Sequence, residues 1–500
     1  MSTFISAKRM WARGGKRATS MTAPHRLAAA ALAASMALGL AGCSTPFLKS
    51  SVQVPSRYAS AAVTTTEPEI AWWQSYGDPV LSDLIGRAAR ENRDVKIAAE
   101  RLRAARAGET ISRSWLFPSI GASAVGVKQN SGYSSTERQV VPNAKVAAGA
   151  LDVSWEIDLA GRLRSGASAS AAETLAAAHG ERGVRLLVMT DVATNYFTLR
   201  GALRQLETLR AIAAAHDETL RLVKARERAG LATPFDVERA ETDALRAHAA
   251  IPPLETVAAI SRNRIAVLIG DQAFNAANIV PNPAEIAAPT IPAGQPATLL
   301  ERRPDLLAAK AQLEAANYRR QAAKAEYFPR LFLSAAFGGQ SVGLNGASLG
   351  ATRFTNVFGL LAMPIFNAGR TRAINEQAES GQSEALLQYE HGIVRALEDV
   401  ESALVSLDQE RQRERTLQSA ATSAQSALSR AQSLYDRGQI DLLPLLDAQR
   451  ARLAVRISAN DSNTQLLLDT VQLYKALGGG WEMFEPTQPA TAATNRSPKS

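Results

Sequence analysis

The amino-acid sequence predicts a mainly α-helical protein with a β-barrel part, built from one structural unit that occurs twice. Residues 157–164 (IDLAGRLR) recur as residues 365–372 (IFNAGRTR), with five of the eight positions identical. Two proline-free stretches at the same spacing, residues 162–229 and 371–437, are far longer than helices of ordinary compact domains. A pair of strand-like segments around a polar loop precedes each stretch. Because self-similarity of this length marks a duplicated unit, we expect one copy to explain the other.

Residues 1–42 predict a signal peptide that ends in a lipobox. A basic flank precedes an apolar run at residues 27–42, which is typical of a secretory leader rather than of a membrane span. The run ends in Leu40-Ala41-Gly42-Cys43, which resembles the bacterial lipobox, whose cysteine is acylated. We therefore expect Cys43 to be the lipid-attachment site; a chance thiol in a leader is the alternative. Translation begins at either Met1 or Met21.

The charge of the mature chain gives little support to a nucleic-acid partner. The whole sequence has a formal net charge of +9, but residues 1–42 hold six Lys and Arg and no acidic residue, so +3 remains. Nucleic-acid binding needs a concentrated basic face. Cys43 is the only cysteine, so we expect no intrachain disulfide. Since no later stretch is apolar for 18 residues, we expect any membrane crossing to be a barrel.

The first repeat is predicted over residues 71–270, after a lipidated tether at residues 43–70 that is rich in Ser, Thr, Val and Pro. Asp78-Pro79 signals a helix start, and apolar spacing predicts one helix from residue 80 to about Trp115. Two strands follow at about 118–160, then the long helix at about 162–229. A return helix of about 39 residues, 232–270, ends at a glycine.

A Pro-rich connector at residues 271–298 leads to the second repeat, residues 299–481. It contains a helix at 299–326, strands at about 329–368, the long helix at about 371–437 and a return helix at 440–477. Residues 482–500 predict a disordered tail. The strands suit a tilted barrel hairpin, with an ordinary soluble hairpin as the alternative. About eight strands form the smallest closed barrel, so four strands per chain predict a barrel shared between subunits.

The sequence offers little that would carry an enzyme's chemistry. The four histidines after the leader stand singly in helices, and we expect them to be solvated rather than metal ligands: His179, His216, His248 and His391. Arg302-Arg303-Pro304-Asp305 is expected to be structural, with Arg303 paired locally, and anion binding is the alternative. We predict no catalytic residue, cofactor or metal.

Two aspartates near the far ends of the long helices are the candidate functional residues. Asp236 follows Gly230 by six residues, and Asp447 follows Gly438 by nine. In a symmetric hollow bundle each side chain would recur as a ring, and rings of Asp select cations. The alternative is that each aspartate faces solvent or pairs with a neighbour such as Arg239 or Arg450.

Over residues 70–481 the chain resembles the bacterial outer-membrane efflux (TolC-like) factors, in the lipoprotein branch that serves resistance-nodulation-division drug pumps. The motifs that carry this resemblance are Trp72-Trp73 with Asp78-Pro79, Trp155-Glu156-Ile157-Asp158-Leu159 with Gly161-Arg162, Leu300-Glu301-Arg302-Arg303-Pro304-Asp305, Pro364-Ile365-Phe366 with Gly369-Arg370, and Leu473-Tyr474-Lys475-Ala476-Leu477-Gly478-Gly479-Gly480-Trp481. The resemblance implies a homotrimer. Each subunit would give four strands to a twelve-stranded barrel in the outer-membrane lipid and long helical hairpins to a periplasmic tunnel.

The resemblance also implies a function and a set of site residues. The trimer would be the exit duct of a tripartite pump for drugs or other small toxic compounds, opened when a periplasmic adaptor protein engages its tips. Asp236 and Asp447 match the gate carboxylates, whereas Pro444 stands where many members have another acidic residue, which predicts a weaker acidic ring. Adaptor contacts are expected at Gly230, Leu231 and Gly438. Barrel–tunnel junctions are expected at Pro118, Gly161, Arg162, Pro329, Gly369 and Arg370.

Two other functions agree with parts of the sequence. A duct for type I protein secretion would share the fold, but by resemblance the lipobox and the Arg-Arg-Pro-Asp motif favour the drug-efflux branch. A periplasmic coiled-coil lipoprotein without a pore would show clean heptads and no strand hairpins, whereas strand pairs occur at matching positions of both repeats. The sequence identifies neither the transported substrates nor the particular pump and adaptor.

Overall fold

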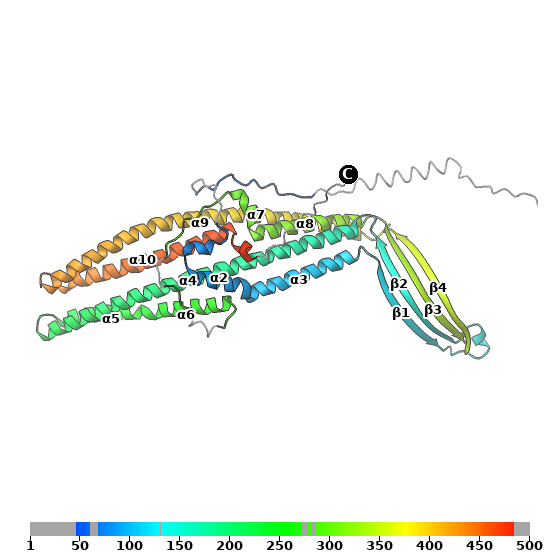
Figure 1. The fold of residues 1–500 in the computed structure, drawn as a ribbon, viewed down its shortest axis with the longest axis horizontal. Coiled ribbons are helices and arrows are strands. Elements are labelled where there is room, and N and C mark those ends of the chain that lie inside the picture. Colours follow the sequence, from blue (N-terminus) through cyan, green and yellow to red (C-terminus); the bar gives the residue numbers. More distant parts are fainter. Residues whose placement is uncertain (1–46, 61–68, 131, 273–278, 283–285, 485–500) are drawn as a thin grey trace, which may run out of the picture. The chain divides into compact units, whose positions relative to one another are not determined.

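The computed structural model describes residues 47–60, 69–130, 132–272, 279–282 and 286–484 of the 500-residue chain. The predicted leader and Cys43 lie outside the described residues, as does most of the predicted tail. In the described part, four strands form one antiparallel sheet and the other long elements are helices (Figure 1). The predicted mainly helical fold with four strands is confirmed.

The sheet is formed by two hairpins that lie side by side. Its strands are hydrogen-bonded in chain order: β1 (Ser119–Gln129), β2 (Ala144–Ile157), β3 (Arg330–Leu344) and β4 (Ala347–Ala362). The turn between β3 and β4 places Asn345 and Gly346 at positive φ, as tight two-residue hairpins require. Strands β1 and β4 are the edges of the sheet, and within the described residues their outer sides have no strand partner.

The register gives the sheet one mostly apolar face and one mixed face. Paired residues of antiparallel strands point to the same side, so the chain of pairs Ile120–Val153, Val153–Ala335 and Ala335–Val357 defines one face. Toward the helices this face is mostly apolar, with Ile120, Ala122, Ala124, Leu151, Val153, Trp155, Leu331, Leu333, Ala335, Phe337, Val357 and Leu361. Toward the far end of the sheet it also carries Lys128, Lys145, Ser341 and Arg353. The opposite face is mixed: it carries the polar residues Ser119, Ser123, Asp152, Ser154, Glu156, Ser334, Gln340 and Asn356 and the apolar residues Val125, Val127, Phe332, Phe354, Phe358 and Leu360.

Two helices of 67 residues form the frame of the helical part. They are α4 (Arg162–Arg228), which follows β2, and α9 (Arg370–Asp436), which follows β4; at 1.5 Å per residue each is about 100 Å long. The shorter helices are α2 (Pro79–Glu91), α3 (Arg93–Ser114), α5 (Pro234–Ala249), α6 (Ile251–Leu268), α7 (Leu299–Arg302), α8 (Pro304–Ala325) and α10 (Leu442–Leu477).

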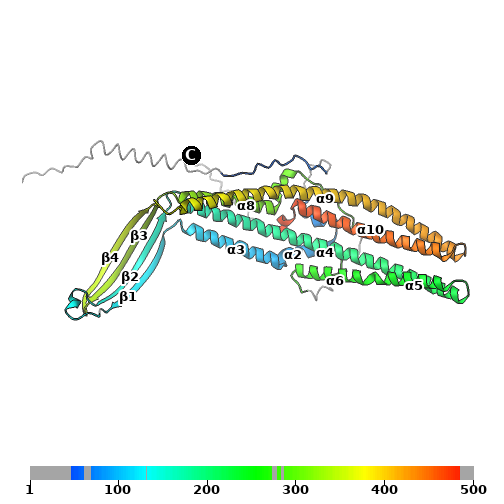
Figure 2. The ribbon, with the colours of Figure 1, turned by 180° about the vertical axis from the view of Figure 1, so that it is seen from behind.

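The shorter helices pack along α4 and α9 in two sets. Next to the strands, neighbouring helices contact one another in the order α3, α4, α8, α9, the same order as the strands that they join. Farther along, α4 contacts α5, α6 and α10, and α10 contacts α9. The turns after α4 and α9 lie at the ends of these helices remote from the sheet (Figures 1 and 2). We call this region, residues 216–250 and 428–450, the helical tip.

Three helices predicted as continuous are interrupted, so those predictions were wrong. Residues 80–115 form α2 and α3, because the Asn92 side chain accepts hydrogen bonds from the N–H groups of Asp94 and Val95 and starts a new helix. Residues 232–270 form α5 and α6, divided just before Pro252-Pro253, whose nitrogens cannot donate to the helix. Arg303 is extended before Pro304 and divides α7 from α8.

The main core gathers the two ends of the described chain around α4 and α10. Trp72 of the short helix η1 (Trp72–Tyr76) stacks on Tyr474 with ring centroids 5.1 Å apart, and Tyr76 lies 4.9 Å from Phe197. We call this region the aromatic hub. Phe484 of η5 (Trp481–Phe484) stacks on Trp73. Residues 482–484 are thus ordered by packing, contrary to the prediction of a tail that starts at 482.

The Arg302-Arg303-Pro304-Asp305 motif lies beside the hub and is structural. Arg303 donates to both carboxylate oxygens of Asp305, to Asp399 of α9 at 2.9 Å and to the Ala476 carbonyl. Gly478 has φ +77°, and a Cβ there would lie 2.6 Å from Cγ of Arg303. The local pairing expected for Arg303 is therefore present, and it joins α8, α9 and the end of α10. No described helix is long and apolar enough to cross a membrane.

Candidate functional site

The two long helices end in similar glycine turns at the helical tip. Gly230 has φ +74° and Gly438 has φ +71°, the left-handed conformation that ends a helix. The N–H of Leu231 reaches back to the carbonyl of Arg226, and that of Gln439 to the carbonyl of Leu434. The Leu231 side chain is 69 % exposed. Both turns therefore lie open at the surface of the chain.

Asp236 lies at the first turn of α5, where it closes a capping box with Thr233. The Thr233 N–H and hydroxyl donate to the Asp236 carboxylate at 2.9 and 2.8 Å, and the Asp236 N–H donates to the hydroxyl at 3.2 Å. These hydrogen bonds hold the pKa of Asp236 below its ordinary value. Asp236 is therefore ionised and fixed in orientation by its own turn.

Asp447 and Pro444 lie in the first two turns of α10. Unlike the start of α5, the start of α10 has no capping box. Asp447 is exposed and contacts Arg450 at 3.4 Å, the neighbour named as an alternative partner in the sequence. Pro444 is also exposed and lines a shallow hollow with Ile440 and Leu434. The two aspartates therefore differ: one caps a helix, and the other is held only by a surface ion pair.

An ion pair that the sequence does not predict joins the two repeats near the tip. Arg450 donates to the two carboxylate oxygens of Asp243 at 2.7 and 3.2 Å. The Asp243 side chain is 5 % exposed and that of Arg450 is 40 % exposed. Hydrogen bonding to Asp243 raises the pKa of Arg450. This pair bridges α5 and α10, which belong to different repeats.

Further polar contacts continue this bridge between α4 and α10. The Gln449 amide donates to Thr219 at 3.0 Å, and the Asn460 amide donates to Gln205 and Thr208. All five side chains except Thr208 are buried. We call this row, including Asp243 and Arg450, the polar seam. No residue pattern signals it, because its partners lie more than 200 residues apart.

His216 and His179 are buried, which contradicts the expectation that the histidines are solvated. His216 lies in the seam, where burial lowers its pKa, Asp243 raises it and Arg450 lowers it. His216 lies on α4, which packs against α5 and α10. His248, in contrast, is exposed and contacts Asp217 at 3.0 Å. Among the described residues no cluster of His, Cys, Asp and Glu could hold a metal ion.

The six predicted junction residues lie between strands and helices. Pro118 and Pro329 immediately precede β1 and β3, and Gly161 and Gly369 cap the starts of α4 and α9 with φ of +82° and +86°. Arg162 donates to both oxygens of Glu156, on the mixed face of the sheet, at 2.8 and 2.7 Å. Arg370 is exposed.

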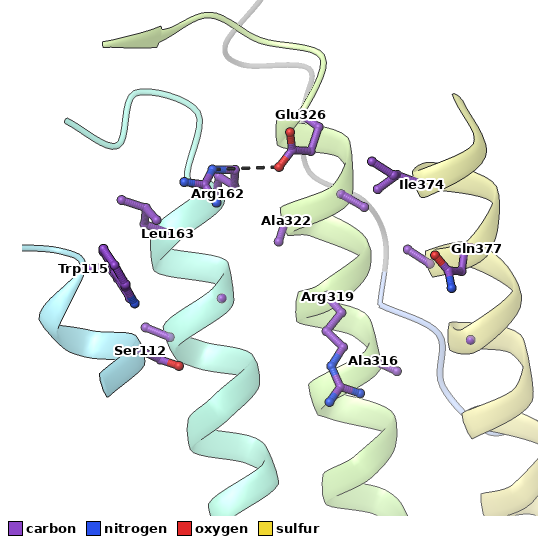
Figure 3. Close-up of a pocket in the computed structure, with 15 residues that line it drawn as sticks. Ser112, Trp115, Arg162, Leu163, Ala316, Arg319, Ala322, Glu326, Ile374 and Gln377 are labelled. Carbon is purple, nitrogen blue, oxygen red and sulfur yellow. Dashed lines mark ion pairs between the residues drawn. The ribbon is translucent and has the colours of Figure 1, made fainter. Parts of the chain in front are cut away.

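A concave pocket of about 570 Å³ lies just beyond these junctions. Helices α3, α4, α8 and α9 all contribute to its lining, through residues that include Trp115, Arg162, Glu326 and Gln377 (Figure 3). A single hollow shared by four successive helices means that the helical layer curves. Arg162 binds Glu156 and also lies 4.0 Å from Glu326, so charged side chains link that face of the sheet to the pocket, whose other lining residues are mostly small or apolar.

Comparisons with known proteins agree with this architecture. The profile of the outer membrane efflux protein family matches residues 84–271 and 296–479. The pyoverdine export outer membrane protein OpmQ of Pseudomonas aeruginosa is 34% identical, with 90% of this chain and 96% of OpmQ covered. The probable outer membrane lipoprotein SilC of Salmonella typhimurium is 27% identical over 88% of this chain and 96% of its own.

A solved structure shows the same fold. The crystal structure of the open state of the Neisseria gonorrhoeae MtrE outer membrane channel has a TM-score of 0.78 and 26% sequence identity, and the match covers 87% of this chain and 98% of that chain. The sheet with one mostly apolar face, the curved helical layer and the family profile lead to one assignment. The chain belongs to the outer membrane efflux protein family and is an outer-membrane efflux channel.

Proposed function

We propose that the protein is the exit duct of a tripartite efflux pump, through which small toxic compounds such as drugs leave across the outer membrane. The observation that supports this proposal is the row of charged side chains, Glu156, Arg162 and Glu326, that links one face of the sheet to the hollow in the helical layer. An apolar outer face and a polar inner face are what a membrane barrel above a water-filled tunnel requires. A duct only conducts, so we infer that it is not an enzyme.

The duct is completed by three copies of the chain. Strand edges with free N–H and C=O groups cannot face lipid, because no water is available to satisfy them. The free edges of β1 and β4 therefore pair between subunits, and three chains give a twelve-stranded barrel. The same closure joins α3 of one subunit to α9 of the next. Each subunit forms one third of the duct, and its two internal repeats form the two halves of that third.

The helical tip is the gate and the place where the periplasmic adaptor binds. Asp236 and Asp447 form rings around the aperture, and the exposed turns at Gly230, Leu231 and Gly438 meet the adaptor. The adaptor in turn connects the duct to an inner-membrane resistance-nodulation-division pump. Acylation of Cys43 anchors each chain in the outer membrane. SilC, a relative described as a lipoprotein, supports this proposal.

Trimer closure is tested by cross-linking across the two edges. The chain has one cysteine, Cys43, whose thiol is blocked once acylated, so introduced cysteines report alone. Ser123→Cys together with Asn356→Cys should give disulfide-linked species up to a trimer on denaturing gels. Ser123→Cys alone is the control and should give no ladder. A double variant that stays monomeric after oxidation in the membrane would contradict the closure.

The gate is tested by ion selectivity in planar bilayers. Asp236→Asn and Asp447→Asn remove charge while keeping shape, and together they should shift the reversal potential in a KCl gradient away from cation preference. Thr233→Ala breaks the same capping box but keeps the Asp236 charge, so its reversal potential should stay unchanged. An unaltered reversal potential in the double variant would remove both aspartates from the aperture.

The transported class is tested with a deletion strain. Loss of the gene should raise sensitivity to dyes, antibiotics or solvents, and a plasmid copy should restore tolerance. Normal tolerance together with loss of a secreted protein would instead assign the duct to type I secretion.

A further inference from the structure

A polar hollow of about 580 Å³ lies along α10, on the sheet side of the helical tip. Residues of α10 line it together with residues of α4 and α9, and both views of the fold show α10 between these two helices (Figures 1 and 2). Because α4 belongs to the first repeat and α9 and α10 to the second, the hollow spans the division between the repeats. Its volume suits a small molecule, since ligand pockets measure about 300–1,000 Å³.

Three arginine side chains give the hollow its charge, and we call it the arginine hollow. They are Arg204 of α4 and Arg452 and Arg456 of α10. Among the described residues that line the hollow, Glu207 is the one acidic residue, so two positive charges are left over. Arg204 and Arg452 are half-buried and Arg456 is exposed. The hollow therefore attracts anions.

Arg452 and Arg456 lack the carboxylate partners that nearby arginines have. Arg450, two residues before Arg452, binds Asp243 at 2.7 Å. Within the described part of the chain, Arg452 and Arg456 make no ion pair and no side-chain hydrogen bond. A guanidinium has five N–H donors and no acceptor, so both side chains keep their full set of donors for a ligand.

The arginines form a row along α10. Arg452 and Arg456 are four residues apart, so they lie on the same side of the helix about 6 Å from each other. Arg204 donates to Oδ1 of Asn463 at 3.1 Å, which fixes its level on α10. Asn463 follows Arg456 by seven residues, about 10 Å of helix. A ligand that meets this row needs two or more acidic groups set several ångströms apart.

The other polar groups of the hollow leave recognition to the guanidiniums. The hydroxyls of Thr208 and Thr422 donate to the carbonyls of Arg204 and Gln418 in their own helices, at 3.0 and 3.1 Å. These hydroxyls therefore have no proton left for an anion. A guanidinium binds a carboxylate or a phosphate through two parallel hydrogen bonds, so these are the acidic groups that the hollow selects.

The arginine hollow lies on the opposite side of α10 from Asp447. Arg456 follows Asp447 by nine residues, which is about 2.5 turns of helix and therefore half a turn away in direction. Under the proposed function Asp447 faces the aperture. The hollow then opens to the periplasm outside the duct, where a small molecule reaches it whether the gate is open or closed.

We propose that the arginine hollow binds a small anion with two or more carboxylate or phosphate groups, and that the bound anion holds the gate closed. The ligand bridges Arg204 of the first repeat and Arg452 and Arg456 of the second, beside the polar seam. Without it, like charges of the two repeats face each other and repel. The site rests on the side chains of this chain alone, whereas the closing role rests on the proposed function.

Binding is tested by calorimetry on the purified full-length protein at low ionic strength, where screening is weak. Adipate, with two carboxylates, is compared with hexanoate, which has the same length and one carboxylate. Fructose 1,6-bisphosphate is compared in the same way with fructose 6-phosphate. At least one of the two doubly acidic probes should bind about tenfold more tightly than its matched compound, and the pair that shows this difference identifies the acidic group. Equal affinities within both pairs would overturn the site.

The arginines are tested by substitutions that remove charge but keep a polar side chain. Arg452→Gln and Arg456→Gln should each weaken binding of the preferred probe about tenfold. Arg395→Gln is the matched control, because Arg395 is an exposed residue of α9 that does not line the hollow, and it should leave the affinity unchanged. Circular dichroism verifies that each variant is folded. Unchanged affinity in the folded double variant Arg452→Gln/Arg456→Gln would overturn the site.

The closing role is tested by single-channel recording in planar bilayers. A ligand that binds only the closed state and is present at 100 times its Kd shifts the closed–open equilibrium by about a hundredfold. The preferred probe should therefore lower the open probability of the unmodified protein and have no effect on the double variant. Binding that leaves the open probability unchanged would overturn the closing role. A protein that forms no conducting channel would refute the proposed function and with it the closing role, while calorimetry decides on the site separately.

Discussion

The ion pair between Asp243 and Arg450 is the polar contact whose loss we expect to loosen the helical tip most. Asp243→Asn is the chosen perturbation, because it keeps the shape of the side chain and one acceptor oxygen. It removes the charge that Arg450 meets at 2.7 and 3.2 Å. Arg450 then has one uncharged acceptor at position 243 and its 3.4 Å ion pair with the exposed Asp447.

The magnitude follows from the unequal burial of the two partners. Breaking a fully buried pair costs about 3–5 kcal/mol, and breaking an exposed pair costs about 0–1 kcal/mol. Asp243 is 5 % exposed, but Arg450 is 40 % exposed, so water screens the guanidinium and the cost lies between these limits. We expect about 1–3 kcal/mol per subunit, which corresponds to about a 5–150-fold shift in a two-state equilibrium.

Single-channel recording in planar bilayers measures this shift as a larger share of time in the high-conductance state. Arg450→Gln should give the same increase, and the double variant should add little to either single change. Arg210→Gln is the matched control, since it breaks an ion pair with Glu255 of 2.7 Å within the first repeat. Open probability that stays at the control level in Asp243→Asn would refute the view that this pair holds the two repeats together at the tip.

Three further changes test the seam, the hub and the entry to the first helix. Burial lowers the pKa of His216 below its ordinary 6.5. The folded tip therefore favours the neutral ring, and the free energy of unfolding should fall as the pH drops below about 6.5. In thermal unfolding, His216→Gln should flatten this part of the pH dependence. Gly478 has φ +77°, and a Cβ at this position would lie 2.6 Å from Cγ of Arg303. Gly478→Ala should therefore lower the free energy of unfolding by more than about 2 kcal/mol in a denaturant titration. Gly438 has φ +71° but no atom within 4 Å of the added Cβ, so Gly438→Ala should lower it by only about 1 kcal/mol. Asp78→Ala removes the cap of α2, a 2.5 Å hydrogen bond from Tyr196 and a 3.5 Å contact with Arg200. It should lower the free energy of unfolding by about 2–4 kcal/mol. An unchanged midpoint of denaturant unfolding would mean that water replaces these contacts without loss.

The strands and the long helices could be predicted, because they depend on local patterns in the sequence. Alternation at Leu331, Leu333, Ala335 and Phe337 predicts a two-faced strand, and the register places these residues on the apolar face. The lengths of α4 and α9 follow from the absence of proline. The break before Pro252-Pro253 was predictable by the same rule, whereas the break at Asn92 needed the capping geometry of a single side chain.

The polar seam was not predictable, for a different reason. The helices of this chain bury many alanines, including Ala193, Ala202 and Ala213 of α4, and small side chains allow several faces of one helix to be covered at once. Periodicity then does not tell which polar residue will meet another helix. In the sequence, His216 and Asp243 occupy positions that look solvent-facing. In the structure both side chains are buried, because α10 packs against this region.

The contacts along α4 predict that the two repeats separate more readily at the tip than at the hub. At the hub they are joined by large apolar surfaces such as Trp72 on Tyr474, and separating these would expose apolar area at about 25 cal/mol per Å². At the tip they are joined by the amides, hydroxyls and one ion pair of the seam and by a smaller apolar cluster that includes Val223, Tyr435 and Leu445. Each such hydrogen bond contributes only about 0.5–1.5 kcal/mol net, because water can take the place of the lost partner. Because the apolar cluster at the tip is smaller than the core at the hub and the seam can be hydrated, we expect the hairpins to part at the tip while the hub stays packed.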